Sequence, residues 1–369
     1  MIRRRSHEVD LTAVRAAVAS VDDPEMHRPI GELGMLGEVT ADRAGRVRVE
    51  IRLTTPSCPL RDAFGTAVTA AVRSVQPDAA VDVDFGVLDE RARRDLALLL
   101  RGAGTGASPV APRIYAVASG KGGVGKSSVT ANLAVALADQ GLAVGLLDAD
   151  VWGYSVPHLF GTRRAPVALS GLMFPVEAHG VRLMSTGFFV TEDEPVVWRG
   201  PMLHKALEQF LADVHWGDLD VLLLDLPPGT GDVTLSLLEL VPTAALLAVT
   251  TPQPAALSVA SRVVTMAQDA RMPVAGVVEN MSVATCEACG HGTALFGEGG
   301  GAALAEKADV PLLAQVPLDT ALREAGDSGV PVVRRNPGAP SAQVLRSLAA
   351  GLPTVRRSIV GVPLPLSVA

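Results

Sequence analysis

Residues 117–128, V-A-S-G-K-G-G-V-G-K-S-S, constrain the fold of this chain more than any other stretch, because they contain the pattern G-x-x-x-x-G-K-S. Glycines at this spacing let consecutive backbone N–H groups turn toward a phosphate, and the following helix points its positive dipole end at the same place. Residues 113–118 predict a buried strand before the loop, and residues 127–140 predict an alanine-rich helix after it. We therefore predict a strand, a P-loop and a helix that together bind a nucleotide.

The residue types within the loop suggest individual roles. Lys126 is expected to reach the β- and γ-phosphates, and Ser127 to ligate Mg²⁺. A second lysine, Lys121, is not needed for the phosphate cradle. We interpret it as an additional charge aimed at the phosphates, usually those of a neighbouring subunit. The predicted cradle consists of Gly120, Lys121, Gly122, Gly123, Val124, Gly125, Lys126, Ser127 and Ser128.

Apolar runs of strand length alternate with helical patterns from residue 113 onward. The helical patterns include residues 202–214 and 257–270. This alternation predicts βαβ units and hence an α/β fold, a doubly wound, mainly parallel sheet with its ligand at the carboxyl ends of the strands. The strand candidates are residues 114–118, 143–147, 181–185, 221–225, 245–250, 274–279 and 312–316.

The chain before residue 113 has a different pattern, typical of a small α+β unit. It predicts helices over 9–21 and 62–75, and strands over 30–40, 46–54 and 80–87. A stretch rich in glycine, alanine, serine and proline follows and predicts a linker. The expected organisation is a small domain over 7–100, a linker over 101–112, a P-loop domain over 113–355 and a tail over 356–369.

Composition excludes several classes of protein. No apolar run reaches the roughly 18 residues that a membrane-spanning helix needs, so no membrane partner is expected. A net charge of −7 disfavours broad binding to nucleic acid. The basic start M-I-R-R-R is not followed by the apolar region of a secretory signal. Three cysteines, an odd number, argue against a disulfide framework and favour the cytoplasm.

Three acidic residues lie at the ends of predicted strands. Asp148 and Asp150 follow one strand, and Asp225 closes another before L-P-P-G-T-G-D. A carboxylate at a strand end near a P-loop is typical of the Walker B arrangement, which holds Mg²⁺. Each aspartate alone is equally compatible with a turn or a helix cap. Three of them at strand ends after a P-loop favour a nucleotide site.

A C-x-x-C pair, Cys286 and Cys289, lies in a glycine-rich stretch and is followed by His291. Two thiolates are half of a tetrahedral zinc or iron–sulfur site. A thioredoxin-like pair is disfavoured, because such pairs open a helix after an early strand. Two alternatives stay open: a zinc site that includes His291, or a site to which two chains of a symmetric dimer each give two cysteines. We expect His291 to be an exposed loop residue rather than a ligand.

The P-loop domain resembles the deviant Walker A ATPases, which include MinD, ParA and the nitrogenase iron protein. The resemblance rests on G-K-G-G-V-G-K-S and extends from residue 113 to about residue 330. It implies an ATP-sandwich homodimer in which Lys121 reaches the partner's phosphates. It also implies roles for four further residues: Asp150 positions the attacking water, Asp148 belongs to the outer Mg²⁺ shell, Asp225 is the switch-II acid and Asn280 contacts adenine.

Three further patterns are similar to the Mrp/ApbC family of iron–sulfur cluster carriers. They are E-N-M-S-x-x-x-C-x-x-C-G-x-x-x-x-x-F-G-x-G-G, D-L-P-P-G-T-G-D and W-R-G-P-M. This resemblance implies that Cys286 and Cys289 of each protomer bind a labile, bridging [4Fe–4S] cluster. The cluster would come from an upstream scaffold and be passed to apo-proteins, with ATP binding and slow hydrolysis changing the conformation of the dimer.

The N-terminal segment resembles the small PaaD-like domain of iron–sulfur assembly factors. The similarity lies in D-P-E at 23–25, G-E-L-G-M at 31–35 and L-T-T-P-S-C-P at 53–59. Cys58 occupies the cysteine position that is characteristic of that domain. Two roles for Cys58 stay open: a reactive or cluster-accepting thiol, and a small buried side chain.

Other functions explain less of the sequence. A positioning ATPase of the MinD or ParA kind, with structural zinc at its dimer interface, is the main alternative, because four thiolates suit zinc as well as iron. The tail cannot form a membrane-binding amphipathic helix past Pro363. An electron donor like the nitrogenase iron protein needs a protected cluster and a redox partner, for which no feature of the sequence argues. We therefore expect an ATP-hydrolysing cluster carrier.

Overall fold

The computed structural model describes residues 9–55, 61–103, 112–151, 153–189, 200–285, 289 and 291–354. The chain divides into two compact units. One comprises Met1–Ala107 and Val167–Phe174, and the other comprises Ser108–Pro166 and Pro175–Ala369. Each unit therefore combines segments that are not adjacent in the sequence. The expected tail, residues 356–369, lies outside the described residues.

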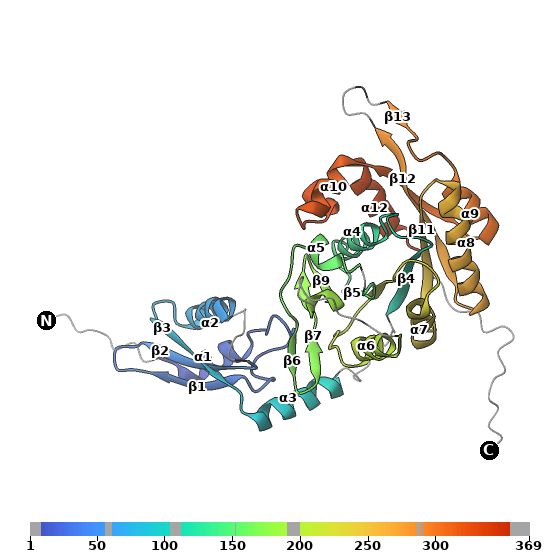
Figure 1. Cartoon of the computed structure of the whole chain (residues 1–369). Coiled ribbons are helices and arrows are strands. Elements are labelled where there is room, and N and C mark those ends of the chain that lie inside the picture. The colour runs from blue at the N-terminus through green and yellow to red at the C-terminus, as the bar shows by residue number, and fades with distance from the viewer. Residues whose placement is uncertain are drawn as a thin grey trace, which may run out of the picture. The chain divides into compact units, whose positions relative to one another are not determined.

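Among the described residues, the N-terminal part of the first unit forms a three-stranded sheet and three helices (Figure 1). The chain order is α1 (Leu11–Ala19), β1 (Leu36–Ala41), β2 (Val47–Leu53), α2 (Arg61–Val75), β3 (Val81–Val87) and α3 (Glu90–Ala103). The central strand β2 pairs antiparallel with β1 and parallel with β3. Residues 47, 49, 51 and 53 of β2 are buried, while the residues between them are charged, so one face of the sheet covers the core. The predicted α+β organisation is confirmed.

Two predicted boundaries in this unit are wrong. The strand expected over 30–40 starts only with β1, because the residues before it form turns that nevertheless bury Ile30. The linker expected over 101–112 overlaps α3, which continues to Ala103. This helix was not predicted, although it is amphipathic and buries Leu100 in the core.

A hairpin from the middle of the chain also belongs to the first unit. Its strands β6 (Val167–Leu169) and β7 (Leu172–Phe174) are antiparallel. Ser170 and Gly171 between them both have positive φ, 48° and 81°, as a type I′ turn requires. Three of its residues are buried in the hydrophobic core of the N-terminal unit: Leu169, Leu172 and Phe174. The P-loop domain expected over 113–355 is therefore interrupted by a segment that packs with the small unit.

In the described part of the second unit, nine strands form one sheet in the order β13-β12-β11-β4-β10-β5-β9-β8, with β14 beside β12. Seven of the strands are mutually parallel: β4 (Arg113–Ser119), β5 (Val144–Asp148), β9 (Val181–Ser185), β10 (Val221–Asp225), β11 (Ala245–Thr250), β12 (Val274–Thr285) and β14 (Leu312–Leu318). The two short strands β8 (Val176–Ala178) and β13 (Gly292–Thr293) are antiparallel to their neighbours. The predicted doubly wound, mainly parallel sheet is confirmed.

Helices cover both faces of this sheet (Figure 1). One group contains α4 (Lys126–Ala138), α5 (Val156–Leu159), α10 (Thr320–Asp327), α11 (Val332–Arg335) and α12 (Pro340–Ala350). The other contains α6 (Gly200–Ala212), α7 (Asp232–Leu240), α8 (Pro254–Asp269) and α9 (Gly300–Ala308). A short 3₁₀ helix, η1 (Thr186–Phe188), follows β9. Each helix of the described residues is too short or too polar to span a bilayer.

The order of the strands brings the predicted acidic residues together. In β10, Asp225 pairs with Val117 of β4 on one side and with Asp148 of β5 on the other. The P-loop follows β4 directly, so it lies at the carboxyl edge of the sheet beside both aspartates. Ligands of open parallel sheets bind at this edge.

Candidate functional site

The P-loop joins β4 to α4 and depends on glycine at three positions for different reasons. Gly123 and Gly125 have φ of 82° and 78°, a region that other residues rarely adopt. Gly125 also lies so close to Asn280 that a Cβ would collide with its side-chain amide. Gly120 has no such φ, but a Cβ there would collide with the backbone of α8. Gly120 therefore serves the packing of the loop against a helix.

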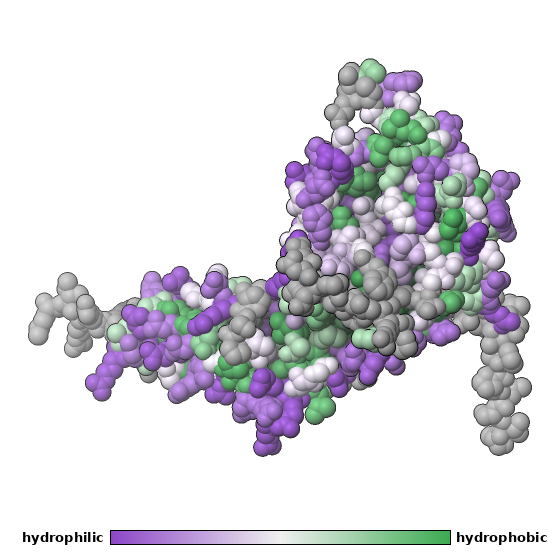
Figure 2. Space-filling view, in the orientation of Figure 1, coloured by the Kyte–Doolittle hydropathy of each residue, from purple (hydrophilic) through white to green (hydrophobic). Residues whose placement is uncertain are grey.

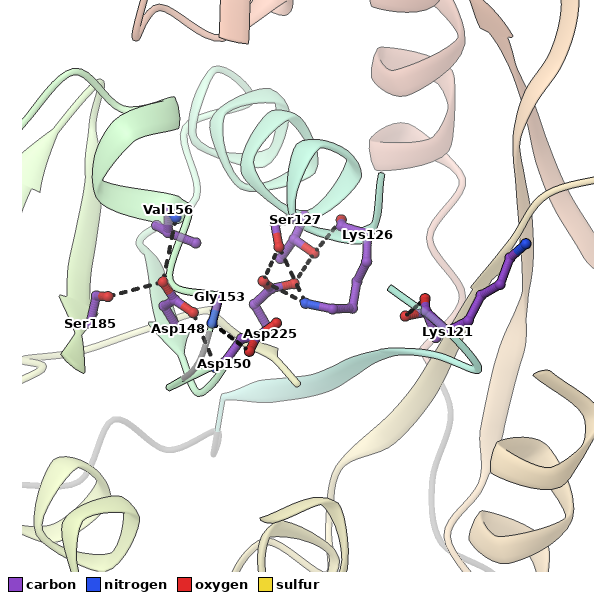
Figure 3. Close-up of polar contacts among 11 residues, drawn as sticks. Lys121, Lys126, Ser127, Asp148, Asp150, Gly153, Val156, Ser185 and Asp225 are labelled. Atoms are coloured by element: carbon purple, nitrogen blue, oxygen red, sulfur yellow. Dashed lines mark hydrogen bonds and ion pairs between the residues drawn. The ribbon is translucent and has the colours of Figure 1, made fainter. Parts of the chain in front are cut away.

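Asp225 accepts several hydrogen bonds from the first turn of α4 (Figure 3). Its Oδ2 lies 2.7 Å from Lys126 Nζ and accepts a 2.5 Å hydrogen bond from the Ser127 hydroxyl. Its Oδ1 lies 2.8 Å from the Thr130 hydroxyl. Lys126 and Asp225 are almost completely buried, 6% and 0% exposed, so this ion pair is well shielded from water. Sequence analysis missed Thr130, which is one turn beyond the motif.

A cavity of about 510 Å³ opens above the loop. Nine predicted residues line it: Lys121, Gly122, Gly123, Val124, Gly125, Lys126, Ser127, Ser128 and Asp150. Of the other predicted site residues, Gly120, Asp148 and Asp225 are not part of its lining. Sequence analysis missed Ser119, Gly153, Ser155, Pro227 and Pro228, which complete the wall. The lining of the cavity combines a glycine-rich loop, two lysines and several serines, which are residue types that bind polyphosphate.

The two aspartates after β5 have different surroundings (Figure 3). Asp150 reaches the cavity, and its Oδ1 accepts a 3.1 Å hydrogen bond from the backbone of Gly153. Asp148 is completely buried and accepts hydrogen bonds from the Ser185 hydroxyl at 2.9 Å and the Asp150 N–H at 3.2 Å. Burial, followed by the charge of Asp225, raises the pKa of Asp148 to about 7, while Lys126 opposes the shift.

We expect Asp148 to make the stability of the protein without nucleotide depend on pH. Its pKa rises from 3.8 unfolded to about 7 folded, so only the folded state holds the proton between these values. The free energy of unfolding therefore falls as the pH rises from about 4 to about 7, by up to about 1.4 kcal/mol per pH unit. Asp148→Asn should remove this contribution. Denaturant unfolding of both proteins between about pH 5 and 8 measures the difference; equal slopes would contradict the assignment.

Asn280 lies within β12 and contacts the P-loop directly. Its Nδ2 donates a 2.9 Å hydrogen bond to the carbonyl of Val124. Its Oδ1 is buried and has no hydrogen-bond partner in the described structure. A second cavity of about 350 Å³ adjoins Asn280 and the first turn of α4. Its further lining includes Met281, Pro317, Leu318 and Asp319, which sequence analysis did not identify.

The cysteine pair belongs to the connection between β12 and β13. Ala284 pairs with Thr293 and Thr285 with Gly292, so β12 and β13 form a hairpin and residues 286–291 are the chain that connects them. This hairpin projects beyond the parallel strands (Figure 1), and Figure 2 shows apolar surface near its base. Val283 on β12 and Leu295, two residues after β13, are 36% and 61% exposed.

Only part of the predicted metal site can be placed. Cys289 is an exposed free thiol, and His291 is exposed as expected. Cys286 and Cys58 lie outside the described residues. Within the described ranges, no three histidine, cysteine, aspartate or glutamate side chains are grouped so that they could hold a metal. A complete site therefore needs further ligands beyond Cys289.

Comparisons with known proteins cover most of the chain and agree on iron–sulfur or iron-transfer proteins as its relatives. Residues 111–352 match the family model described as NUBPL iron-transfer P-loop NTPase, and residues 11–83 match the model described as iron–sulfur cluster assembly protein. A protein of Mycobacterium bovis named iron–sulfur cluster carrier protein is 50% identical, with 96% of each chain covered. A protein of the same name from Deinococcus radiodurans is 43% identical over 91% of this chain and 93% of its own.

One solved structure supports the same grouping. It is a nucleotide-binding protein from Archaeoglobus fulgidus in complex with ADP, with cobalt present. It is 36% identical, has a TM-score of 0.56, and covers 67% of this chain and 94% of its own.

Proposed function

This chain belongs to the family of iron-transfer P-loop NTPases, and from this premise we propose that it is an iron–sulfur cluster carrier whose cluster transfer is driven by ATP. In this proposal two protomers share one [4Fe–4S] cluster as cargo. The cluster arrives from an upstream scaffold and is handed to apo iron–sulfur proteins. We expect a cytoplasmic location, because Cys286 and Cys289 must stay reduced to bind iron, and neither nucleic acid nor a membrane has a part in the function.

The residues around the first cavity support ATP binding and hydrolysis. We assign the polyphosphate to the P-loop amides and to Lys126. On nucleotide binding, Lys126 would leave its ion pair with Asp225 and bind the β- and γ-phosphates instead. Ser127 and Asp225 then offer adjacent oxygen atoms of the kind that Mg²⁺ prefers, directly or through water. When bound, Mg²⁺ would neutralise phosphate charge. Asp150 reaches the same cavity and is our candidate for orienting the attacking water.

The second cavity supports a preference for adenine. It adjoins the P-loop, so a base linked to the bound phosphates would lie beside Asn280. The unpaired Oδ1 of Asn280 is an acceptor that the exocyclic amine of adenine would satisfy. Guanine offers an acceptor at the corresponding position and would leave the buried oxygen unpaired, which is costly.

The exposed hairpin supports a cluster shared between protomers. A [4Fe–4S] cluster needs four thiolates, and one chain supplies only Cys286 and Cys289 in the segment that connects β12 to β13. A second copy related by a two-fold axis would supply the other two. The exposure of Cys289 suits cargo that must be loaded and released.

The observation that carries the proposed coupling is the course of β12. Asn280, which contacts the P-loop, and Cys286 are six residues apart, and the strand between them continues to Thr285. The strand changes direction at Met281, whose φ is 58°, and its register against β14 shifts after Asn280. A displacement of the P-loop on ATP binding is therefore passed to the cysteine hairpin along one continuous strand.

We expect Asn280→Ala to uncouple cluster transfer from ATP. At saturating ATP, the ATP-dependent increase in transfer to an apo-acceptor should fall at least about fivefold, the lower end of typical coupling energies. The iron content should be unchanged, because no thiolate is lost. Asn132→Ala is a matched control, since Asn132 is another buried asparagine, lies on α4, and has hydrogen bonds to Ser128 and Val333 rather than to β12. Transfer that keeps its full ATP dependence in Asn280→Ala would refute this route.

A further inference from the structure

The side chain of Lys121 is directed away from the Lys126–Asp225 pair (Figure 3). Its Nζ donates a 3.1 Å hydrogen bond to Oε1 of Gln253, the residue before α8. The hydroxyl of Thr251 donates to the same Oε1 at 3.3 Å, so the amide is held in place. This hydrogen bond to Gln253 is the only polar contact of Lys121 Nζ within the described part of the chain.

The fold holds both partners of the hydrogen bond, Lys121 and Gln253, in position. The strands β4 and β11 are parallel neighbours, so the P-loop and the segment after β11 leave the sheet side by side. Gly120 lies against the backbone of α8 with no room for a Cβ. The Ser119 hydroxyl donates a 3.1 Å hydrogen bond to the carbonyl of Lys121. The backbone of Lys121 is therefore fixed relative to α8, at whose start Gln253 lies.

We propose that Gln253 is a positioning residue that holds Lys121 within its own protomer until the phosphates of a partner-bound ATP replace the amide. The inference rests on the proposed ATP-dependent dimer. A neutral amide oxygen suits this role, because a lysine bonded to it is held less strongly than one bonded to a carboxylate. A polyphosphate with several negative charges can therefore capture Lys121. Because this contact must break first, it raises the protein concentration at which the dimer assembles.

Amine acylation followed by mass spectrometry tests the contact directly. The chain has only four lysines, so each can be followed separately: Lys121, Lys126, Lys205 and Lys307. Gln253→Ala should raise the acylation rate of Lys121 about two- to twelvefold, the strength of one ordinary hydrogen bond. Gln253→Glu should lower that rate below the wild-type value. The exposed Lys205 should react equally in all proteins.

Two features separate loss of the Lys121–Gln253 contact from general destabilisation of the fold. Gln253 makes no side-chain hydrogen bond that caps α8, so its replacement by alanine removes no helix cap. Gln268→Ala changes the same residue type near the other end of α8 and should leave Lys121 unaffected.

ATP hydrolysis at increasing protein concentration separates this inference from the proposed function. Gln253→Ala should reach half-maximal specific activity at a protein concentration about two- to twelvefold lower than wild type, and Gln253→Glu at a higher one. Equal acylation of Lys121 in wild type and both variants would overturn the inference, even if all three hydrolyse ATP. Altered acylation without any hydrolysis would uphold the contact and refute the proposed ATPase instead.

Discussion

Lys126→Met is expected to lower the rate of ATP hydrolysis at least about a hundredfold, because the variant loses the charge that stabilises the transferred phosphoryl group. Lys126 begins α4 and lines the P-loop cavity, with its Nζ 2.7 Å from Asp225. Methionine keeps most of the side-chain volume, so the cavity should remain. Phosphate release at saturating ATP measures the effect.

Lys205→Met is the matched control for this prediction. Lys205 lies on α6 and is exposed, and it lines neither of the two cavities that we assign to ATP. Because Lys126→Met also leaves Asp225 without its buried counter-charge, thermal unfolding of each variant is measured alongside. Hydrolysis within a few-fold of wild type in a folded Lys126→Met protein would show that this loop is not the catalytic site.

Serine at both Cys286 and Cys289 is expected to reduce cluster-bound iron at least about tenfold, because a serine hydroxyl does not replace a thiolate as a ligand of iron. Nucleotide binding should be retained, since Cys289 lines neither cavity that we assign to ATP. Iron content after anaerobic reconstitution and titration with a fluorescent ATP analogue measure the two effects.

His291→Ala separates a site made of cysteines from the zinc alternative that includes a histidine. His291 follows the cysteine pair and is exposed. The variant should keep its iron content if two protomers supply four thiolates. Loss of metal in His291→Ala would contradict the shared cysteine site. Unchanged iron in the double serine variant would show that the cluster binds elsewhere in the chain.

The strands β4, β5, β9, β10 and β11 could be predicted because each is a mainly apolar run that ends at a polar residue. The ranges expected for β9, β10 and β11 agree with the structure residue by residue. The P-loop and Asp225 could be identified for the same reason, since local sequence places them at strand ends. Features that depend on contacts between distant parts of the sequence were missed or misplaced. The hairpin β6–β7 is an example, because its apolar residues pack with a segment far away in the sequence.

The missed site residues share a physical cause. Gln253 reaches Lys121 only because β4 and β11 are neighbours in the sheet, an order that no local pattern reveals. Pro317, Leu318 and Asp319 line the second cavity because β14 pairs with β12. The extension of β12 beyond residue 279 was also missed, since the residues after Met281 no longer form a uniformly apolar run.

Iron, acid-labile sulfide and zinc per protomer, measured after anaerobic purification and reconstitution, test the central claim most directly. The account predicts about two iron and two sulfide ions per protomer with little zinc, which corresponds to one [4Fe–4S] cluster for each pair of chains. About half a zinc ion per protomer with no iron, even after reconstitution, would mean that the cysteines form a structural dimer site. That result would contradict the assignment of this protein as a cluster carrier.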